Sequence, residues 1–183
     1  MEPTTKIPQR SEIPVEDTWA IEDLYPSDAA WEEELKTLDA DQARLAAFAG
    51  RLAESAETLY DYLDLTEQTE VKLSRLGNYC SRRADVDTRD AVYQAMTGRF
   101  MSVVVSLGAA TSFETPEIMA ISDETLEGFY RDFPKLTRYR RYLNDQRRRR
   151  EHVLSPPRRS CWPLPVKWLR RRTLFSVRSM TPT

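Results

Sequence analysis

Few side chains in this sequence are of the types that carry catalysis, and they lie far apart along the chain. The sequence has a single histidine, His152, and two cysteines, Cys80 and Cys161. A zinc motif that needs two histidines is therefore excluded, and no histidine lies near Cys80 to activate its thiol. We interpret Cys80 as a buried, inert thiol on the apolar face of a helix, and His152 as a structural or loop residue.

Charged groups offer two further candidates for binding. Asp85 and Asp87 could bind a hard cation, but two carboxylates without further oxygen ligands favour helix capping instead. The four arginines from Arg147 to Arg150 could touch phosphates, although they are also favourable at a helix end, where the dipole is negative. We therefore predict that this chain has no catalytic, no cofactor-binding and no metal-binding residue.

The elements that position these groups are predicted to be helices. Only 5 glycines among 183 residues argue against a turn-rich β fold. Ser27 is a suitable helix N-cap, apolar residues follow at helical spacing as far as Phe48, and Gly50 is a natural stop. A second helical stretch starts near Ala53 and continues or restarts as far as Cys80.

The rest of the body shows the same periodicity. Asp87 or Thr88 is expected to cap a third helix over residues 90–112, and Thr115-Pro116, Ser122 and Pro134 each begin a further helix. No convincing strand alternation occurs, so the sequence predicts an all-α, antiparallel helical stack. The third helix is expected to bury Val92, Met96, Phe100, Val103, Val104 and Leu107, and the last helix Leu136, Tyr139, Tyr142 and Leu143.

Composition divides the chain into three parts. Residues 1–26 are predicted to form an extended lead-in that docks through Trp19 and Tyr25, on helices bearing Trp31, Phe48 and Phe100. Residues 27–154 are predicted to form the helical lobe. Residues 155–183 are predicted to be a disordered tail, because they contain no acidic residue, whereas the whole chain has 29. The seven cations of this tail are Arg158, Arg159, Lys167, Arg170, Arg171, Arg172 and Arg178.

Several classes of protein are excluded by the remaining features. No apolar stretch is long enough to span a bilayer, and residues 1–10 lack the apolar core of a secretory signal. Two cysteines make no disulfide framework and fit a reducing compartment. We expect a cytoplasmic protein that has no contact with a membrane.

Four segments are distinctive in their order and spacing: Thr18–Tyr25, Asp85–Thr88, Ser112–Ile118 and His152–Pro156. Together they resemble the N-terminal region of oligoendopeptidase F, a bacterial zinc metallopeptidase family related to thimet oligopeptidase. The resemblance covers about residues 10–156. It implies a mostly helical, two-lobed cytoplasmic peptidase that cuts short peptides inside a deep channel. In that case this chain would supply part of the N-terminal lobe that walls the channel.

The zinc of this family is held by a helix with the motif His-Glu-x-x-His and by a later glutamate, and the first glutamate acts as general base on the zinc-bound water. No position of this sequence matches that motif. The resemblance therefore implies that zinc is a cofactor of the full-length family but not of this chain. We expect the chain to be inactive alone, as a truncated peptidase.

The resemblance stops near Pro157, where the unusual composition begins. Codons can be chosen for residues 158–167 that, read in a shifted frame, encode an acidic helix rich in leucine and alanine. This suggests that a frameshift produced residues 155–183. The alternative is a small helical interaction protein whose basic arm binds nucleic acid, and we consider specific nucleic-acid binding the weaker interpretation.

Overall fold

The computed structural model describes residues 12–148 of the chain. The chain divides into a compact unit of residues 1–146 and a second unit of residues 147–183, and the fold below is that of the first. The predicted tail 155–183, the end of the predicted lobe and residues 1–11 lie outside the described residues. Six α-helices occur in the described part, with no strand: α1 (Asp28–Ala46), α2 (Ala56–Val86), α3 (Ala91–Ala110), α4 (Glu114–Ala120), α5 (Asp123–Asp132) and α6 (Arg140–Arg148).

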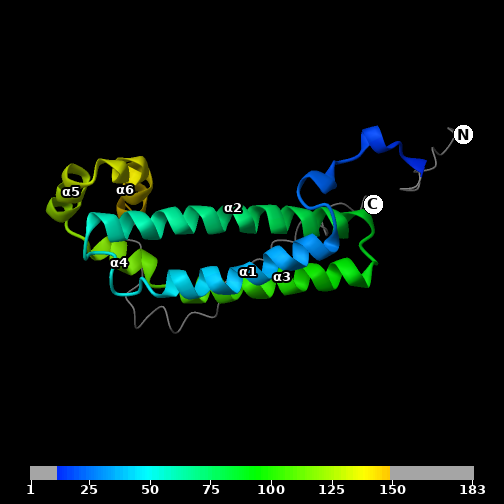
Figure 1. Cartoon of the computed structure of the whole chain (residues 1–183), viewed down its shortest axis with the longest axis horizontal. Helices are drawn as coiled ribbons and strands as arrows, with labels where there is room; N and C mark the ends of the chain where they lie inside the picture. Colours follow the sequence, from blue (N-terminus) through cyan, green and yellow to red (C-terminus); the bar gives the residue numbers. More distant parts are fainter. Residues whose placement is uncertain (1–11, 149–183) are drawn as a thin grey trace, which may run out of the picture. The chain divides into compact units, whose positions relative to one another are not determined.

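The predicted all-α class is confirmed, and the three long helices pack as an antiparallel set. Helix α2 lies beside both α1 and α3 and runs in the opposite direction to each (Figure 1). Helices α1 and α3 also contact each other. Among the described residues, no helix is both long and apolar enough to cross a bilayer.

Helix α1 begins as the sequence predicts. The Ser27 hydroxyl accepts a hydrogen bond from the backbone N–H of Ala30 at 3.2 Å, which satisfies one of the unpaired donors of the first turn. The helix ends at Ala46, and Gly50 follows in the connection with a φ of 79°, a backbone conformation that residues with a side chain rarely adopt. The Glu117 carboxylate of α4 accepts hydrogen bonds from Gly50 N at 2.6 Å and Leu52 N at 3.3 Å, so it holds this connection in place.

Helix α2 is one continuous element of 31 residues. It begins at Ala56 rather than near Ala53, because the Ser55 hydroxyl accepts a hydrogen bond from Thr58 N at 3.0 Å and so fixes the cap.

The predicted cap of α3 is wrong. Asp90, not Asp87 or Thr88, accepts from Val92 N at 2.8 Å, whereas Asp87 binds Arg89 instead.

Helix α3 buries less of its apolar surface than predicted. Met96 and Leu107 are buried and Phe100 is half-buried, but Val92 is 65% exposed because it lies in the first turn, beside the connection from α2. Arg99 is the single charged residue of this helix, and its guanidinium bonds to the Glu32 carboxylate on α1.

The remaining helices follow short connections. The Ser122 hydroxyl caps α5 by accepting from Thr125 N at 3.0 Å, as predicted. Pro134 opens a 3-10 turn (Pro134–Tyr139) that leads into α6. Leu136, Tyr139 and Leu143 are buried as predicted, whereas Tyr142 is 38% exposed.

The interior consists of two apolar clusters, and α2 contributes to both. The Trp31 cluster contains Ile21, Tyr25 and Trp31 together with residues of α1, α2 and α3. The larger cluster joins the first half of α2 to α4, α5, the 3-10 turn and α6, and it also contains Leu45 of α1 and Leu107 of α3. Leu73, on α2, packs against both.

The lead-in docks differently from the prediction. Ile21 and Tyr25 are buried in the Trp31 cluster, and the Tyr25 and Tyr79 rings pack edge to face with their centroids 5.5 Å apart. Trp19 is 79% exposed, so the prediction that it packs onto the helices is wrong. Two 3-10 turns (Val15–Asp17 and Ile21–Asp23) flank it and direct Ile21, rather than Trp19, into the core. Phe48 also departs from expectation, because it packs against the larger cluster.

Candidate functional site

Cys80 is a buried structural thiol, as the sequence indicated. Its side chain is fully buried in the Trp31 cluster, and its Sγ donates to the Gly77 carbonyl oxygen at 3.4 Å. Burial raises the pKa of the Cys80 thiol above its ordinary value, which disfavours the nucleophilic thiolate. Cys80 is therefore a poor nucleophile.

The two candidate aspartates each bind an arginine. A carboxylate oxygen of Asp85 lies 3.5 Å from a guanidinium nitrogen of Arg82. The Asp87 carboxylate accepts two hydrogen bonds of 3.0 Å from the Arg89 guanidinium. These hydrogen bonds lower the pKa of Asp87 to about 2. Within residues 12–148, no three His, Cys, Asp or Glu side chains are placed to hold a metal ion.

The other candidates fall at or beyond the end of the described chain. Arg147 and Arg148 lie in the last turn of α6, the helix end that the sequence predicted for them. Arg149, Arg150, His152 and Cys161 lie outside the described residues.

A set of tyrosine–carboxylate pairs on α2, α4 and the last two helical elements was not predicted from the sequence. Glu114 accepts from the Tyr62 hydroxyl at 3.0 Å and also from the Tyr142 hydroxyl. Glu67 accepts from the Tyr139 hydroxyl at 2.8 Å. Burial, with these carboxylates nearby, raises the pKa of all three phenols. The phenols therefore stay protonated and act as fixed donors. Tyr62 ties α2 to α4, Tyr142 ties α6 to α4, and Tyr139 ties the 3-10 turn to α2.

Glu70 is an exposed residue of α2 that lies beside these pairs. Partial burial raises the pKa of its carboxyl, and the neighbouring Glu114 and Glu67 charges raise it further, so the fold disfavours its charge only slightly. A raised folded pKa gives stability that is complete below the unfolded value of about 4.3 and is lost as pH rises through the folded value.

We expect Glu70→Gln to raise the melting temperature at pH 7, because it removes this disfavoured charge. The gain should vanish near pH 3.5, where the carboxyl is protonated in both states. Thermal unfolding of the two chains at several pH values measures the difference. A gain that does not change with pH would contradict a charge effect.

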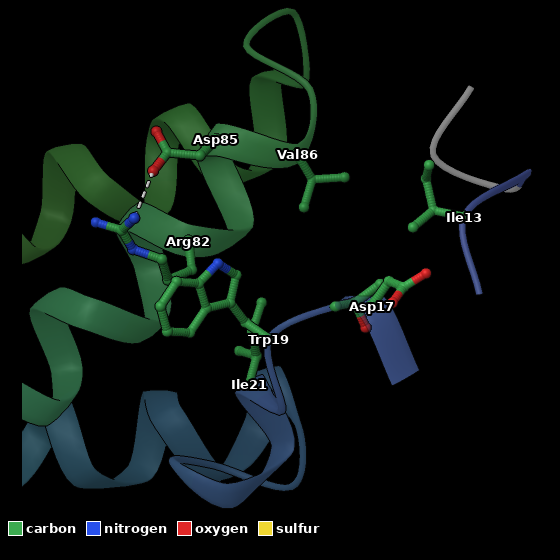
Figure 2. Close-up of a pocket in the computed structure, with 8 residues that line it drawn as sticks. Ile13, Asp17, Trp19, Ile21, Arg82, Asp85 and Val86 are labelled. Atoms are coloured by element: carbon green, nitrogen blue, oxygen red, sulfur yellow. Dashed lines mark ion pairs between the residues drawn. The ribbon is translucent and has the colours of Figure 1, made fainter. Parts of the chain in front are cut away.

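Two open surface pockets adjoin Trp19, at the end of α2 that leads to α3 (Figure 2). Two cavities, of about 240 and 500 Å³, share Trp19, Ile21 and Arg82 in their walls. Figure 2 shows the Trp19 indole beside the Arg82 side chain, with Ile13 and Val86 across the opening. We call this region the Trp19 cleft, and it is lined by Ile13, Asp17, Thr18, Trp19, Ala20, Ile21, Asp23, Leu24, Asn78, Arg82, Asp85 and Val86.

The chemistry of the Trp19 cleft suits binding rather than catalysis. Its lining contains no histidine or cysteine, and its arginine, Arg82, is paired with Asp85. Apolar surface and carboxylates make up much of the rest. Such a site can hold an apolar group beside carboxylates, but it offers no nucleophile that a neighbouring base would activate.

Comparisons with known proteins agree on one family. A family model described as Oligopeptidase F matches residues 117–159. The chain is similar to Oligopeptidase PepF of Bacillus subtilis, with 33% identity over 150 residues, which cover 82% of this chain and 22% of that protein. It is also similar to the plasmid-encoded Oligoendopeptidase F of Lactococcus lactis subsp. cremoris, with 29% identity over 147 residues, 80% of this chain and 24% of that protein.

Solved structures give the same result. The oligoendopeptidase-F from Enterococcus faecium superposes with a TM-score of 0.65 and 26% identity, over 74% of this chain and 27% of that one. This chain therefore spans about a quarter of the length of the relatives it matches.

Proposed function

Since this chain belongs to the oligoendopeptidase F family and corresponds to the N-terminal region of its members, we propose that it is the helical lobe that walls the peptide channel of a zinc endopeptidase. The observation that supports this most is the agreement of sequence and fold with such peptidases over most of the described residues. In this proposal the lobe shapes the channel for short peptides, and the metal chemistry belongs to another part of the enzyme.

The residues present do not fit a catalytic zinc. Such a site takes three protein ligands and leaves one position for water. The sequence has one histidine, and the described residues hold no group of three possible ligands. We therefore derive no step of peptide hydrolysis from this chain, and we propose that it is inactive by itself.

We expect the purified chain to hydrolyse no short peptide and to bind no stoichiometric zinc. A quenched fluorescent peptide of about ten residues, with zinc added in excess, would report cleavage, and elemental analysis after dialysis would report metal. The B. subtilis relative, treated in the same way, serves as the positive control. Zinc-dependent cleavage by this chain would show that it holds an active centre of its own.

A chimera tests the role of the lobe directly. Residues 12–148 of this chain would replace the matching segment of the B. subtilis relative, which leaves that protein's remaining part intact. We expect the chimera to cleave the same peptide, and we expect its specificity to change if the lobe contacts substrate. A chimera that binds zinc and stays folded but cleaves nothing would contradict the proposed channel-wall role.

For residues 155–183 we propose an origin in a shifted reading frame. The change in composition and the end of the family match, at residue 159, support this proposal. The gene sequence is the test: a single-base insertion or deletion near codon 157 should restore an open frame that reaches a His-Glu-x-x-His motif. We further propose a cytoplasmic location, which fractionation of the producing cells would test.

Nucleic-acid binding by the basic tail remains the second candidate, because residues 155–183 contain seven cations and no acidic residue. Such binding would weaken steeply with salt, because phosphate contacts release counterions. A gel-shift titration at low and high salt decides it. Absence of binding at low salt eliminates this candidate.

A further inference from the structure

We propose that the Trp19 cleft docks a polypeptide segment that presents an aliphatic or aromatic side chain flanked by lysine or arginine. This inference does not rest on the peptidase assignment. Its basis is the position of one exposed tryptophan between two cavities, in a segment, residues 12–23, whose charged residues are all acidic.

Exposure of Trp19 is the first observation. The Trp31 indole is fully buried and donates to the Leu76 carbonyl oxygen at 2.9 Å, whereas Trp19 is 79% exposed. Val86, which lines the same cleft, is 48% exposed. Large exposed apolar side chains beside a cavity are typical of interaction sites, and tryptophan is enriched among the residues that dominate binding energy.

The shape of the cleft is the second observation. The larger cavity has a volume of about 500 Å³, within the range of about 300–1,000 Å³ found for ligand pockets. Trp19, Ile21 and Arg82 line both cavities, so the indole stands between them and can contact an inserted side chain from either side. Apolar lining residues, including Ile21, Leu24 and Val86, then remove that side chain from water.

Charge is the third observation, and it selects the kind of partner. Residues 12–23 contain five acidic residues and no lysine or arginine. Asp17 and Asp23 line the cleft itself. The Arg82 guanidinium is held by Asp85 at 3.5 Å, and Arg75 donates to the Leu24 carbonyl oxygen at 2.8 Å. A segment with positive side chains on either side of its apolar anchor complements this surface. The five acidic residues are Glu12, Glu16, Asp17, Glu22 and Asp23.

Contrast with another exposed apolar residue supports the assignment. Val71 on α2 is 56% exposed, but its neighbours one turn away, Glu67, Gln68, Ser74 and Arg75, are polar or charged. It lines neither cavity of the Trp19 cleft. Val71 is a solitary exposed valine, whereas Trp19 belongs to a concave apolar site.

The probe for the test is a blocked synthetic hexapeptide, Lys-Arg-Leu-Phe-Arg-Lys, added to the full-length ¹⁵N-labelled chain. We expect the indole N–H resonance of Trp19, assigned by its loss in Trp19→Phe, to shift on titration. The Trp31 indole resonance should not shift, because its N–H is bonded inside the core. Two further hexapeptides serve as controls: Glu-Glu-Leu-Phe-Glu-Glu lacks the positive charge, and Lys-Arg-Ser-Ser-Arg-Lys lacks the apolar anchor.

Calorimetry of the same peptide with cleft variants measures how much Trp19 and the two aspartates contribute to the binding affinity. We expect Trp19→Ala to weaken binding at least tenfold, and the pair Asp17→Asn and Asp23→Asn to weaken it several-fold at low salt and less at high salt. Val71→Ala is the matched control and should bind as the unchanged chain does. Equal binding of the acidic peptide, or unchanged binding by the Trp19→Ala chain, would overturn the proposal.

The chain's own basic residues could compete with the peptide through their charge. The titration is therefore repeated on the full chain with Arg170→Ser, Arg171→Ser and Arg172→Ser, which removes three of the seven cations of residues 155–183. Binding that appears or strengthens in this variant, and is lost on adding Trp19→Ala, supports the proposed site. Absence of binding in both backgrounds contradicts it.

Discussion

Trp31→Ala is expected to lower the free energy of unfolding by about 3–5 kcal/mol, a large part of the stability of a small domain. The Trp31 side chain is fully buried between α1, α2 and the lead-in, and its Nε1 donates to the Leu76 carbonyl oxygen at 2.9 Å. Truncation removes the largest side chain of the Trp31 cluster and leaves a cavity that the neighbouring helices can only partly fill. Urea unfolding followed by circular dichroism measures the loss.

Trp19→Ala is the matched control for this substitution. It removes the same side chain from a position that is 79% exposed, so we expect its effect on stability to stay within about 0.5 kcal/mol. If Trp31→Ala prevents folding, Trp31→Phe gives a smaller loss that is still measurable. Equal losses for the two alanine variants would mean that the lead-in does not dock as described.

Gly77→Val is expected to lower the free energy of unfolding by about 1–3 kcal/mol through overpacking. A Cβ at Gly77 would lie 2.9 Å from Cζ at the tip of the Phe100 ring, so this ring of α3 would have to shift. The present packing of the Phe100 ring against α2 therefore uses the absence of a side chain at Gly77. Chemical denaturation of the variant gives the difference.

Two further variants separate this contact from a general effect of glycine replacement in a helix. Gly98 on α3 has no neighbouring atom within 4 Å of the same built position, so Gly98→Val should be nearly neutral. Phe100→Leu, added to Gly77→Val, should recover part of the lost stability because it removes the ring that clashes. Similar losses at Gly77 and Gly98 would refute the packing explanation.

Helices and their caps were predictable because their signals are local. Ser27 and Ser122 cap α1 and α5 through hydrogen bonds to residues three positions later, so the sequence pattern contains all the required information. Asp90 shows the limit of this reasoning. Several aspartates near the end of α2 could cap the next helix, and only the backbone path decides which one does.

The burial of individual aromatic residues was harder to predict. Trp19 and Trp31 are both large and apolar, but only the three-dimensional path of the lead-in shows that Trp19 faces outward. The pairs of Tyr62 with Glu114 and of Tyr139 with Glu67 join residues 52 and 72 positions apart. No local pattern identifies such pairs, because each partner alone is an ordinary surface residue type.

The candidate site, too, could be predicted from the sequence only in part. The sequence excluded a two-histidine zinc motif by composition, and it identified Cys80 as a buried thiol because of its place on an apolar helical face. The Trp19 cleft was not predicted, since it forms where the lead-in crosses the end of α2, and sequence alone did not give the path of that crossing.

The continuity of α2 through both apolar clusters has a consequence for how the protein opens. At about 1.5 Å per residue this helix is roughly 46 Å long, and Leu73 joins the clusters at its middle. Helices α1 and α3 also place buried residues in both clusters, so all three long helices connect them, and we expect the amides of both clusters to exchange through one cooperative opening. Emission from Trp31 would then report the melting of both clusters together.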